Sequence, residues 1–400
     1  MADCILITST TGKRIPLSVY PYLGVGYLAS ALERNGYSVK LIDVDAGLHS
    51  MHSILRVLVE EKPVLTGYSI LSRSLPFFRA LTPLIRKTLP ETCILGGGPH
   101  PTADPGIISK LGADWGIMGD GETSLPVILE SLKSGKPVPS DLPGLIRPCS
   151  GGVTTNPFPK DLLIDPSLDP AYHLYPLDAY CDIVYPGVRS FSIETSRGCI
   201  YNCNFCSNHS KSKLRYYPLE TVERQVSTLV DQHQVKWIAF VDDLFTFNKE
   251  RVVTLCETIL NEGWKFRWSC LTRADHLDDE MLKIMAAAGL HNIIFGVESG
   301  SDLVRAGDNK RIRNEQYSHA IRMCDKYGIR SLNTYIFGHP GEKLRDMTSS
   351  IIHSIRLNPH LTHYQLMSPL PDSPLFEQGI SEGLWNKDSW AEYIDRKSVV

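Results

Sequence analysis

The sequence predicts an α/β protein with two domains, a doubly wound parallel sheet followed by a partial (β/α)6 barrel. Short β-rich runs alternate with helical periods over residues 1–135 and again from Ser190 onward. The stretch between these two series is rich in proline and has no regular period. Alternation of this kind is typical of βαβ units, in which parallel strands are covered by helices on the sheet faces. A length of 400 residues is enough for two such domains.

The first series predicts a Rossmann-like domain over residues 1–136. Helical periods at Val25–Arg34 and Leu75–Leu89 separate its β-rich runs, as expected when helices cross between parallel strands. The strand candidates are Cys4–Thr8, Ser38–Val44, Leu65–Ile70, Thr92–Gly97 and Trp115–Gly119.

Residues 137–189 are predicted to be a linker that runs in an extended form between the two domains. Ten of the 26 prolines lie between Pro137 and Pro186, and neither a helical nor a strand period survives there. Proline removes a backbone donor and restricts its neighbours, so a dense set of prolines disfavours regular elements.

The second series predicts an open barrel over residues 190–376. Six βα units are two fewer than the eight of a closed barrel, so one side should remain open. Residues 377–400 are too few for a further domain and are expected to form a C-terminal tail. The strand candidates are Ser190–Glu194, Trp237–Val241, Phe266–Leu271, Asn292–Val297, Ser331–Phe337 and His363–Met367, and helical periods such as Leu219–His233 and Glu250–Glu262 fill the gaps.

The composition is that of an ordinary soluble globular protein. Hydrophobic residues make up 42% and charged residues 21%, and a formal net charge of −3 gives no general attraction to nucleic acid or anionic lipid. No apolar run reaches the ~20 residues that span a bilayer. The ten cysteines are scattered in mostly apolar segments and are expected to be reduced thiols. We therefore expect a cytoplasmic protein without nucleic-acid or membrane partners.

Three cysteines directly after the first barrel strand predict a metal site. Cys199, Cys203 and Cys206 in "RGCIYNCNFCSNH" lie where α/β barrels carry their active sites, at the carboxyl end of a strand. Three thiolates can hold three irons of a [4Fe–4S] cluster and leave the fourth iron open for chemistry. The alternative is a zinc site with His209 as the fourth ligand. We favour the cluster, because a zinc knuckle does not require six βα units behind it.

The segment "CIYNCNFC" resembles the signature of the radical S-adenosylmethionine (SAM) superfamily, C-x₃-C-x-aromatic-C, with Phe205 in the aromatic position. The resemblance extends over about residues 190–376. It implies that the amino and carboxylate groups of SAM bind the open iron of the cluster. It also implies cleavage of SAM to a 5′-deoxyadenosyl radical that abstracts hydrogen from a small-molecule substrate, with a flavodoxin, a ferredoxin or a partner reductase as electron donor.

The later strand ends resemble the SAM-binding segments of that superfamily. The resemblance implies that Asp242 or Asp243 contacts the SAM ammonium group and that Arg273 grips its carboxylate, which suits a bidentate guanidinium. The other implied contacts are Glu298 and Ser299 to the ribose hydroxyls or the amino group, and the segment with Gly338 along the adenine. Each has an ordinary alternative: a helix cap for the two aspartates, an Arg273–Asp275 ion pair, or tight packing at the glycine.

The N-terminal segments "ILGGGPHPTADP" and "GIMGDGETSL" resemble the cobalamin-binding domain fused to one large class of radical SAM enzymes. Glycines at strand ends let the backbone approach a flat ligand. The histidine motif D-x-H-x-x-G, which supplies a cobalt ligand in other cobalamin proteins, is absent. The resemblance implies cobalamin as a cofactor. Because the histidine motif is absent, the alternative is that the domain is kept as a scaffold without cobalamin. The implied contacts are Gly96, Gly97, Gly98, His100, Gly119 and Gly121.

Three functions are compatible with these features. The favoured one is cobalamin-dependent C-methylation of a small molecule, most simply a natural product. The alternative is a cobalamin-independent radical dehydratase or lyase that deoxygenates a sugar or an aminoglycoside-like substrate, with Tyr216 or Tyr217 as the catalytic acid. Packing of these two tyrosines under the cysteine loop is their more ordinary role. The third function, a non-enzymatic iron–sulfur or cobalamin sensor, does not account for the SAM-contact residues.

Overall fold

A computed structural model describes residues 1–9, 20–157, 164–181, 187–207 and 213–386 of the chain. The chain divides into two compact units, Met1–Gly187 together with Glu377–Val400, and Val188–Phe376. Helix α13 (Pro374–Ser381) contains the second division point. None of the helices in the described ranges combines the length and the apolar character that a membrane crossing requires.

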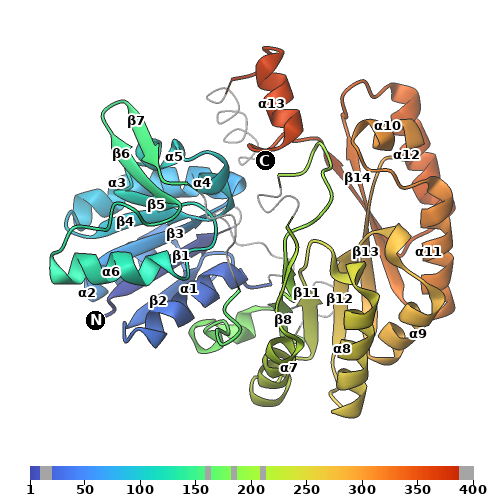
Figure 1. The fold of residues 1–400 in the computed structure, drawn as a ribbon, viewed down its shortest axis with the longest axis horizontal. Coiled ribbons are helices and arrows are strands. Elements are labelled where there is room, and N and C mark those ends of the chain that lie inside the picture. The colour runs from blue at the N-terminus through green and yellow to red at the C-terminus, as the bar shows by residue number, and fades with distance from the viewer. Residues whose placement is uncertain (10–19, 158–163, 182–186, 208–212, 387–400) are drawn as a thin grey trace. The chain divides into compact units, whose positions relative to one another are not determined.

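The first unit is built on a sheet whose described strands have the order β2-β1-β3-β4-β5-β6-β7 (Figure 1). The strands β1 to β5 are parallel, and β6 and β7 are antiparallel additions at one edge. The order confirms the expected Rossmann-like arrangement and reverses direction beside β1, where sheets of this type bind ligands beyond the strand ends. The strands are β1 (Cys4–Ser9), β2 (Val39–Asp43), β3 (Leu65–Ile70), β4 (Cys93–Gly97), β5 (Trp115–Ile117), β6 (Leu145–Cys149) and β7 (Gly152–Thr155).

Helices cover both faces of this sheet, and its central strands β1 and β3 are therefore buried along their whole length. Helices α1 and α6 pack together, and α3 packs on α2 and on α5. The helices are α1 (Leu23–Arg34), α2 (Met51–Glu61), α3 (Leu75–Thr88), α4 (Pro99–Ala103), α5 (Ile107–Leu111) and α6 (Ser124–Ser134).

The segment 137–189 differs from the extended linker that its prolines predict. Strands β6 and β7 form a hairpin that continues the first sheet. Farther on, the segment runs along α1, where Ala171 N donates to the Gly26 carbonyl across 3.1 Å. Gly26 is required here, because a Cβ on it would lie 2.6 Å from the Tyr175 hydroxyl oxygen. Prolines hide the period of this segment, but its contacts with α1 and the sheet still give it a defined structure.

The second unit is a parallel sheet with the described order β15-β14-β13-β12-β11-β8, which confirms the partial (β/α)6 barrel. Each strand neighbours the next one along the chain, and β8 and β15 are the two edges. The strands are β8 (Ser190–Ile193), β11 (Trp237–Phe240), β12 (Arg267–Thr272), β13 (Leu290–Glu298), β14 (Arg330–Phe337) and β15 (Leu361–Leu366).

Two helices of the second unit begin at an asparagine or aspartate cap. Asn248 accepts from Arg251 N at the start of α8, and Asp278 accepts from Met281 N at the start of α9. The helix after β8 ends in a π-helical turn at Thr228–Gln232. The helices are α7 (Leu219–Ser227), α8 (Lys249–Asn261), α9 (Asp279–Ala287), α10 (Asp302–Gly307), α11 (Asn314–Lys326) and α12 (Leu344–Leu357).

Candidate functional site

The cysteine loop leaves the carboxyl end of β8, as the sequence predicts. A short strand, β9 (Ser196–Arg197), pairs antiparallel with β10 (Arg215–Tyr216) at the base of the loop. Gly198 then adopts a φ of +96°, a left-handed conformation that favours glycine, and the chain turns into Cys199. Cys199, Cys203 and Cys206 are partly exposed.

Asparagine side chains hold the loop against the end of α10. Asn204 N donates to the Asp308 carbonyl across 3.0 Å, and its side chain donates to the Gly307 carbonyl across 2.8 Å. In return, Asn309 donates to the Asn202 carbonyl across 2.9 Å. The two asparagines of the loop flank Cys203, so these bonds fix the backbone that carries the cysteines.

Asp242 holds the exit of β8 from the neighbouring strand end. Its buried carboxylate accepts from Thr195 N at 3.0 Å, from the Thr195 hydroxyl at 2.7 Å and from the Ser196 hydroxyl at 2.5 Å. Burial raises the pKa of Asp242, and these hydrogen bonds act in the opposite direction. Asp243 is exposed. Helix α8 is capped by Asn248, so neither aspartate caps it. The structure gives Asp242 a positioning contact, and a SAM contact from either aspartate stays a prediction.

Arg273 lies over the ring of Tyr201, a residue of the cysteine loop, with 3.7 Å from its guanidinium carbon to the ring centroid. Its guanidinium donates two hydrogen bonds to the Asp275 carboxylate, from Nε across 3.0 Å and from Nη2 across 2.9 Å. The Tyr201 hydroxyl is 2.6 Å from Nε2 of His276. The ion pair anticipated as the ordinary alternative is therefore present, yet it lies against the cysteine loop and is mostly buried.

Glu298 ends β13 in a left-handed conformation, with a φ of +65°. Its carboxylate accepts from Lys310 Nζ across 2.7 Å, and both side chains are buried. The positive charge of Lys310 lowers the pKa of Cys203, against the larger effect of burial. No motif marked Lys310 in the sequence, since it lies in the irregular loop between α10 and α11.

Gly338 and Ser299 occupy tight positions at the ends of β14 and β13. Gly338 has a φ of +94°, and its N–H donates to Glu342 Oε2 across 2.6 Å. Ser299 is fully buried, and its hydroxyl is 3.2 Å from that of Ser350. His339, the residue after Gly338, packs its imidazole edge-on against the Phe205 ring, with ring centroids 6.4 Å apart. Phe205 thus connects the cysteine loop to the end of β14.

The two tyrosines beyond the loop have different surroundings. The Tyr217 hydroxyl donates to Glu194 Oε2 across 3.3 Å, and its ring lies under the Arg197 guanidinium. Tyr216 packs against the Arg251 guanidinium, 5.1 Å from the ring centroid. Its buried hydroxyl has no hydrogen-bond partner among the residues that the structure describes. Packing under the loop accounts for Tyr217, and a catalytic role for Tyr216 stays a prediction.

The cysteine loop fits an iron–sulfur cluster. Burial raises the pKa of Cys199 and of Cys203, while the nearby positive charges of Arg273 and Lys310 lower it and favour the thiolate that binds iron. Within the described ranges, no three His, Cys, Asp or Glu side chains converge on a single metal-ion position. His209, the fourth ligand of the zinc alternative, lies outside the described residues.

In the first unit, glycines leave the backbone uncovered by side chains at the carboxyl end of β4. A Cβ on Gly97 would meet only backbone oxygens, that of Ile117 at 3.7 Å and that of Tyr68 at 4.0 Å, which are ordinary contacts. Gly98 has a φ of +98°. Gly119 also has a positive φ, and its N–H donates to the Thr102 hydroxyl across 2.9 Å. These positions form an edge that a flat cofactor such as cobalamin can approach.

The other predicted cobalamin contacts have packing roles in this structure. A Cβ on Gly96 would lie 2.6 Å from Ile108 Cδ1, so this glycine admits α5 to the sheet. A Cβ on Gly121 would lie 3.1 Å from a methyl carbon of Leu28. His100 is buried in α4, with Nδ1 2.9 Å from the Ser72 hydroxyl. Side chains of the protein therefore pack against these three residues in this structure.

Comparisons with known proteins match the two units separately. Residues 193–351 match the radical SAM superfamily, and residues 16–129 match the B12 binding domain. The first range contains the cysteine loop and every strand from β11 to β14, and the second contains the glycine-lined exits of β4 and β5.

Similar proteins include methyltransferases. An uncharacterized methyltransferase of Pyrococcus horikoshii is 28% identical over 96% of this chain and 84% of its own length. Cytidylyl-2-hydroxyethylphosphonate methyltransferase of Streptomyces wedmorensis is 26% identical over 92% of this chain and 79% of its own. Among solved structures, the radical SAM methyltransferase TsrM of Kitasatospora setae, with cobalamin and a [4Fe–4S] cluster bound, matches with a TM-score of 0.79. That match covers 96% of this chain and 75% of TsrM, at 19% identity.

Proposed function

Because the chain is a radical SAM enzyme that also carries a B12-binding domain, we propose that it methylates a carbon atom of a small-molecule substrate. The observation that carries the proposal is the pairing of two sites in one chain. One is a three-cysteine loop fixed at the carboxyl edge of a partial barrel, and the other is a glycine-containing strand exit in a B12-binding fold. The bound cluster supplies the electron that cleaves SAM, and cobalamin carries the methyl group.

The residues of the second unit have distinct tasks in this proposal. Cys199, Cys203 and Cys206 hold the cluster. The Arg273 guanidinium lies beside the loop and binds the SAM carboxylate. In this structure the carboxylate of Asp275 pairs with the same guanidinium. Asp243 pairs with the SAM ammonium, while Asp242 keeps the loop in place.

The substrate and the reductant complete the proposal. The methyltransferases similar to this chain include one named for a small molecule, a cytidylyl phosphonate, which supports a small-molecule substrate here. Reduction of the cluster requires a one-electron donor, and we assign this role to a flavodoxin, a ferredoxin or a partner reductase.

Anaerobic reconstitution tests the function directly. The full chain is loaded with iron, sulfide and hydroxocobalamin, passed through gel filtration, and analysed for cobalt and iron. It is then reduced with SAM present, and 5′-deoxyadenosine and S-adenosylhomocysteine are quantified. We expect retained cobalt and both SAM products. Protein that retains no cobalt yet still forms 5′-deoxyadenosine would overturn methyl transfer and favour the dehydratase.

A further inference from the structure

A pocket of about 520 Å³ lies between the loop after β13, the start of α11 and the length of α12. Its volume is within the range of small-molecule sites. None of the residues assigned above to the cluster, to SAM or to cobalamin lines it. The side chains that matter for its chemistry are those of Asn314, Leu344, Arg345, Ile352, His353 and Arg356.

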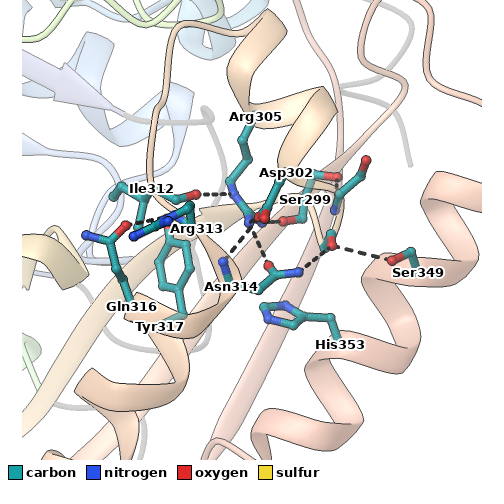
Figure 2. A network of polar contacts seen from close by, with 12 residues as sticks. Ser299, Asp302, Arg305, Ile312, Arg313, Asn314, Gln316, Tyr317, Ser349 and His353 are labelled. Carbon is teal, nitrogen blue, oxygen red and sulfur yellow. Dashed lines mark hydrogen bonds and ion pairs between the residues drawn. The ribbon is translucent and has the colours of Figure 1, made fainter.

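His353 brings an unpaired polar atom to this pocket. The residue is only 9% exposed, and its ring extends from α12 towards the start of α11 (Figure 2). Nδ1 is 3.0 Å from the Tyr335 hydroxyl, whereas Nε2 is buried without a partner in the described part of the chain. With Tyr335 donating to Nδ1, Nε2 carries a hydrogen that a ligand can accept. An unpaired buried donor is costly, and a bound acceptor removes that cost.

The charge around the pocket favours an anion. Arg345 and Arg356 are exposed, and neither side chain has a hydrogen bond or an ion pair within the described residues. Behind them, Arg305 is fully buried, and one of its amino groups is paired with Asp302. The remaining acidic neighbour of His353 is Glu315, which is exposed on α11. Two free guanidinium groups on one helix suit a phosphate or a carboxylate.

The buried Arg305 network makes the wall of the pocket rigid (Figure 2). Arg305 donates to the Ile312 carbonyl across 2.8 Å and to Asn314 Oδ1 across 2.6 Å. Asn314 in turn donates to the Gly300 carbonyl across 2.9 Å. Only glycine fits at this last position, because a Cβ on Gly300 would lie 2.6 Å from the Ser349 carbonyl oxygen. The loop after β13 is thereby held against α12 without a bound ligand.

We propose that this pocket binds a small organic anion, a phosphate or carboxylate group attached to an apolar body. The anion lies beside Arg356 and His353, which are one turn apart on α12, and accepts from His353 Nε2, while Arg345, about 16 Å along the helix from Arg356, adds positive charge at the other end of the pocket. The apolar body covers Leu344 and Ile352, which are 78% and 42% exposed on the same helix. None of the residues proposed to bind the cluster, SAM or cobalamin lines the pocket, although Ser299 directly precedes Gly300 of its lining.

Calorimetric titration of the full-length, cluster-loaded protein tests the site with three probes: phenyl phosphate, benzoate and inorganic phosphate. We expect saturable binding of phenyl phosphate or benzoate, and the tighter of the two identifies the anionic group. Inorganic phosphate should bind more weakly, because it cannot cover the apolar residues. Arg356→Gln should weaken binding about tenfold, which is the scale of one charge-assisted hydrogen bond, and Arg345→Gln should weaken it less, because Arg345 lies about three turns away along α12.

The control is Arg322→Gln, which removes an exposed arginine from α11 outside the pocket and should leave binding unchanged. His353→Gln should weaken binding while iron content and SAM cleavage stay at the wild-type level. The proposal fails if neither organic anion binds saturably. It also fails if Arg356→Gln binds the probes as tightly as Arg322→Gln does.

Discussion

Lys310 donates from Nζ to Oε1 of Glu298 across 2.7 Å, and this buried ion pair joins the α10–α11 loop to the end of β13. Gly296 makes room for the pair, since a Cβ there would lie 2.7 Å from Lys310 Nζ. The pair also lies close enough to Cys203 for the lysine charge to lower the pKa of that thiol. One contact therefore contributes both to the fold and to the electrostatics of the cysteine loop.

Replacing Lys310 with methionine should lower the free energy of unfolding by about 3–5 kcal/mol, because it leaves the Glu298 carboxylate buried without its partner. Urea unfolding of the apoprotein measures the change. The control Lys283→Met removes an exposed lysine from α9 and should change stability by less than about 0.5 kcal/mol. Equal stability of the two variants would show that the pair does not contribute.

Replacing Cys199 with alanine should remove the [4Fe–4S] cluster, because three thiolates are needed to hold it. Iron and sulfide analysis and the visible spectrum after anaerobic reconstitution measure the loss, and SAM cleavage should disappear with it. Cys149→Ala, at an exposed thiol on β6, should retain full iron content. Wild-type iron and sulfide in a triple alanine variant of Cys199, Cys203 and Cys206 would contradict the assignment.

Arg273→Ala should weaken SAM binding by about 1.5–3 kcal/mol, the scale of a hydrogen bond to a charged group. Equilibrium dialysis with the cluster-loaded protein measures the affinity. Iron content should stay unchanged, because Arg273 is not a cluster ligand. Arg267→Ala provides the matched control at the opposite end of the same strand, where the side chain is exposed. If both variants bind SAM equally well, Arg273 does not hold the SAM carboxylate.

Gly97→Val should abolish cobalamin binding and leave the cluster intact, because a branched side chain would fill the exit of β4. A Cβ at this position has no contact shorter than 3.7 Å, so the fold should tolerate alanine, and wild-type iron content in the valine variant would show that its second unit still folds. Gly97→Ala is the graded control and should retain more cobalt than Gly97→Val. Cobalt analysis after gel filtration measures the bound cobalamin. A wild-type cobalt content in the valine variant would show that cobalamin does not bind at the exit of β4.

Asp43 should make the first unit less stable as the pH rises from about 4 to about 6. Burial raises the pKa of Asp43 from 3.8 to about 6, although a hydrogen bond from Tyr180 acts against this effect. The folded state thus binds this proton more tightly than the unfolded state, so the stability it contributes at low pH is lost above the folded pKa. Asp43→Asn should therefore gain stability relative to the wild type between pH 4 and pH 7.

A shift of about two pKa units means that the gain in stability of Asp43→Asn over the wild type changes by about 3 kcal/mol at most between pH 4 and pH 7. Chemical denaturation of both proteins at pH 4 and pH 7 measures it. A stability difference between variant and wild type that does not change with pH would mean that Asp43 titrates normally in the folded state.

The fold class and the parallel strands of both units were predictable from the sequence, because alternating apolar runs and helical periods are local patterns, whereas β6 and β7 were not predicted. Strand β3 has the bounds expected for it, and β14 differs from its expectation by one residue. The cysteine loop was equally predictable, since its position depends on one strand and on the spacing of three residues along the chain. The segment that packs along α1 was not, because its prolines conceal contacts made with residues more than 130 positions away.

The partners of the charged groups were decided only by the tertiary structure. The sequence placed Asp242 and Arg273 at strand ends, but the fold turned Asp242 to Thr195 and paired Arg273 with Asp275. Lys310 carried no motif and became a neighbour of Cys203 through the α10–α11 loop. The physical reason is that a buried charge must be paired or hydrogen-bonded, and the group that satisfies it is whichever one the packed elements bring within reach.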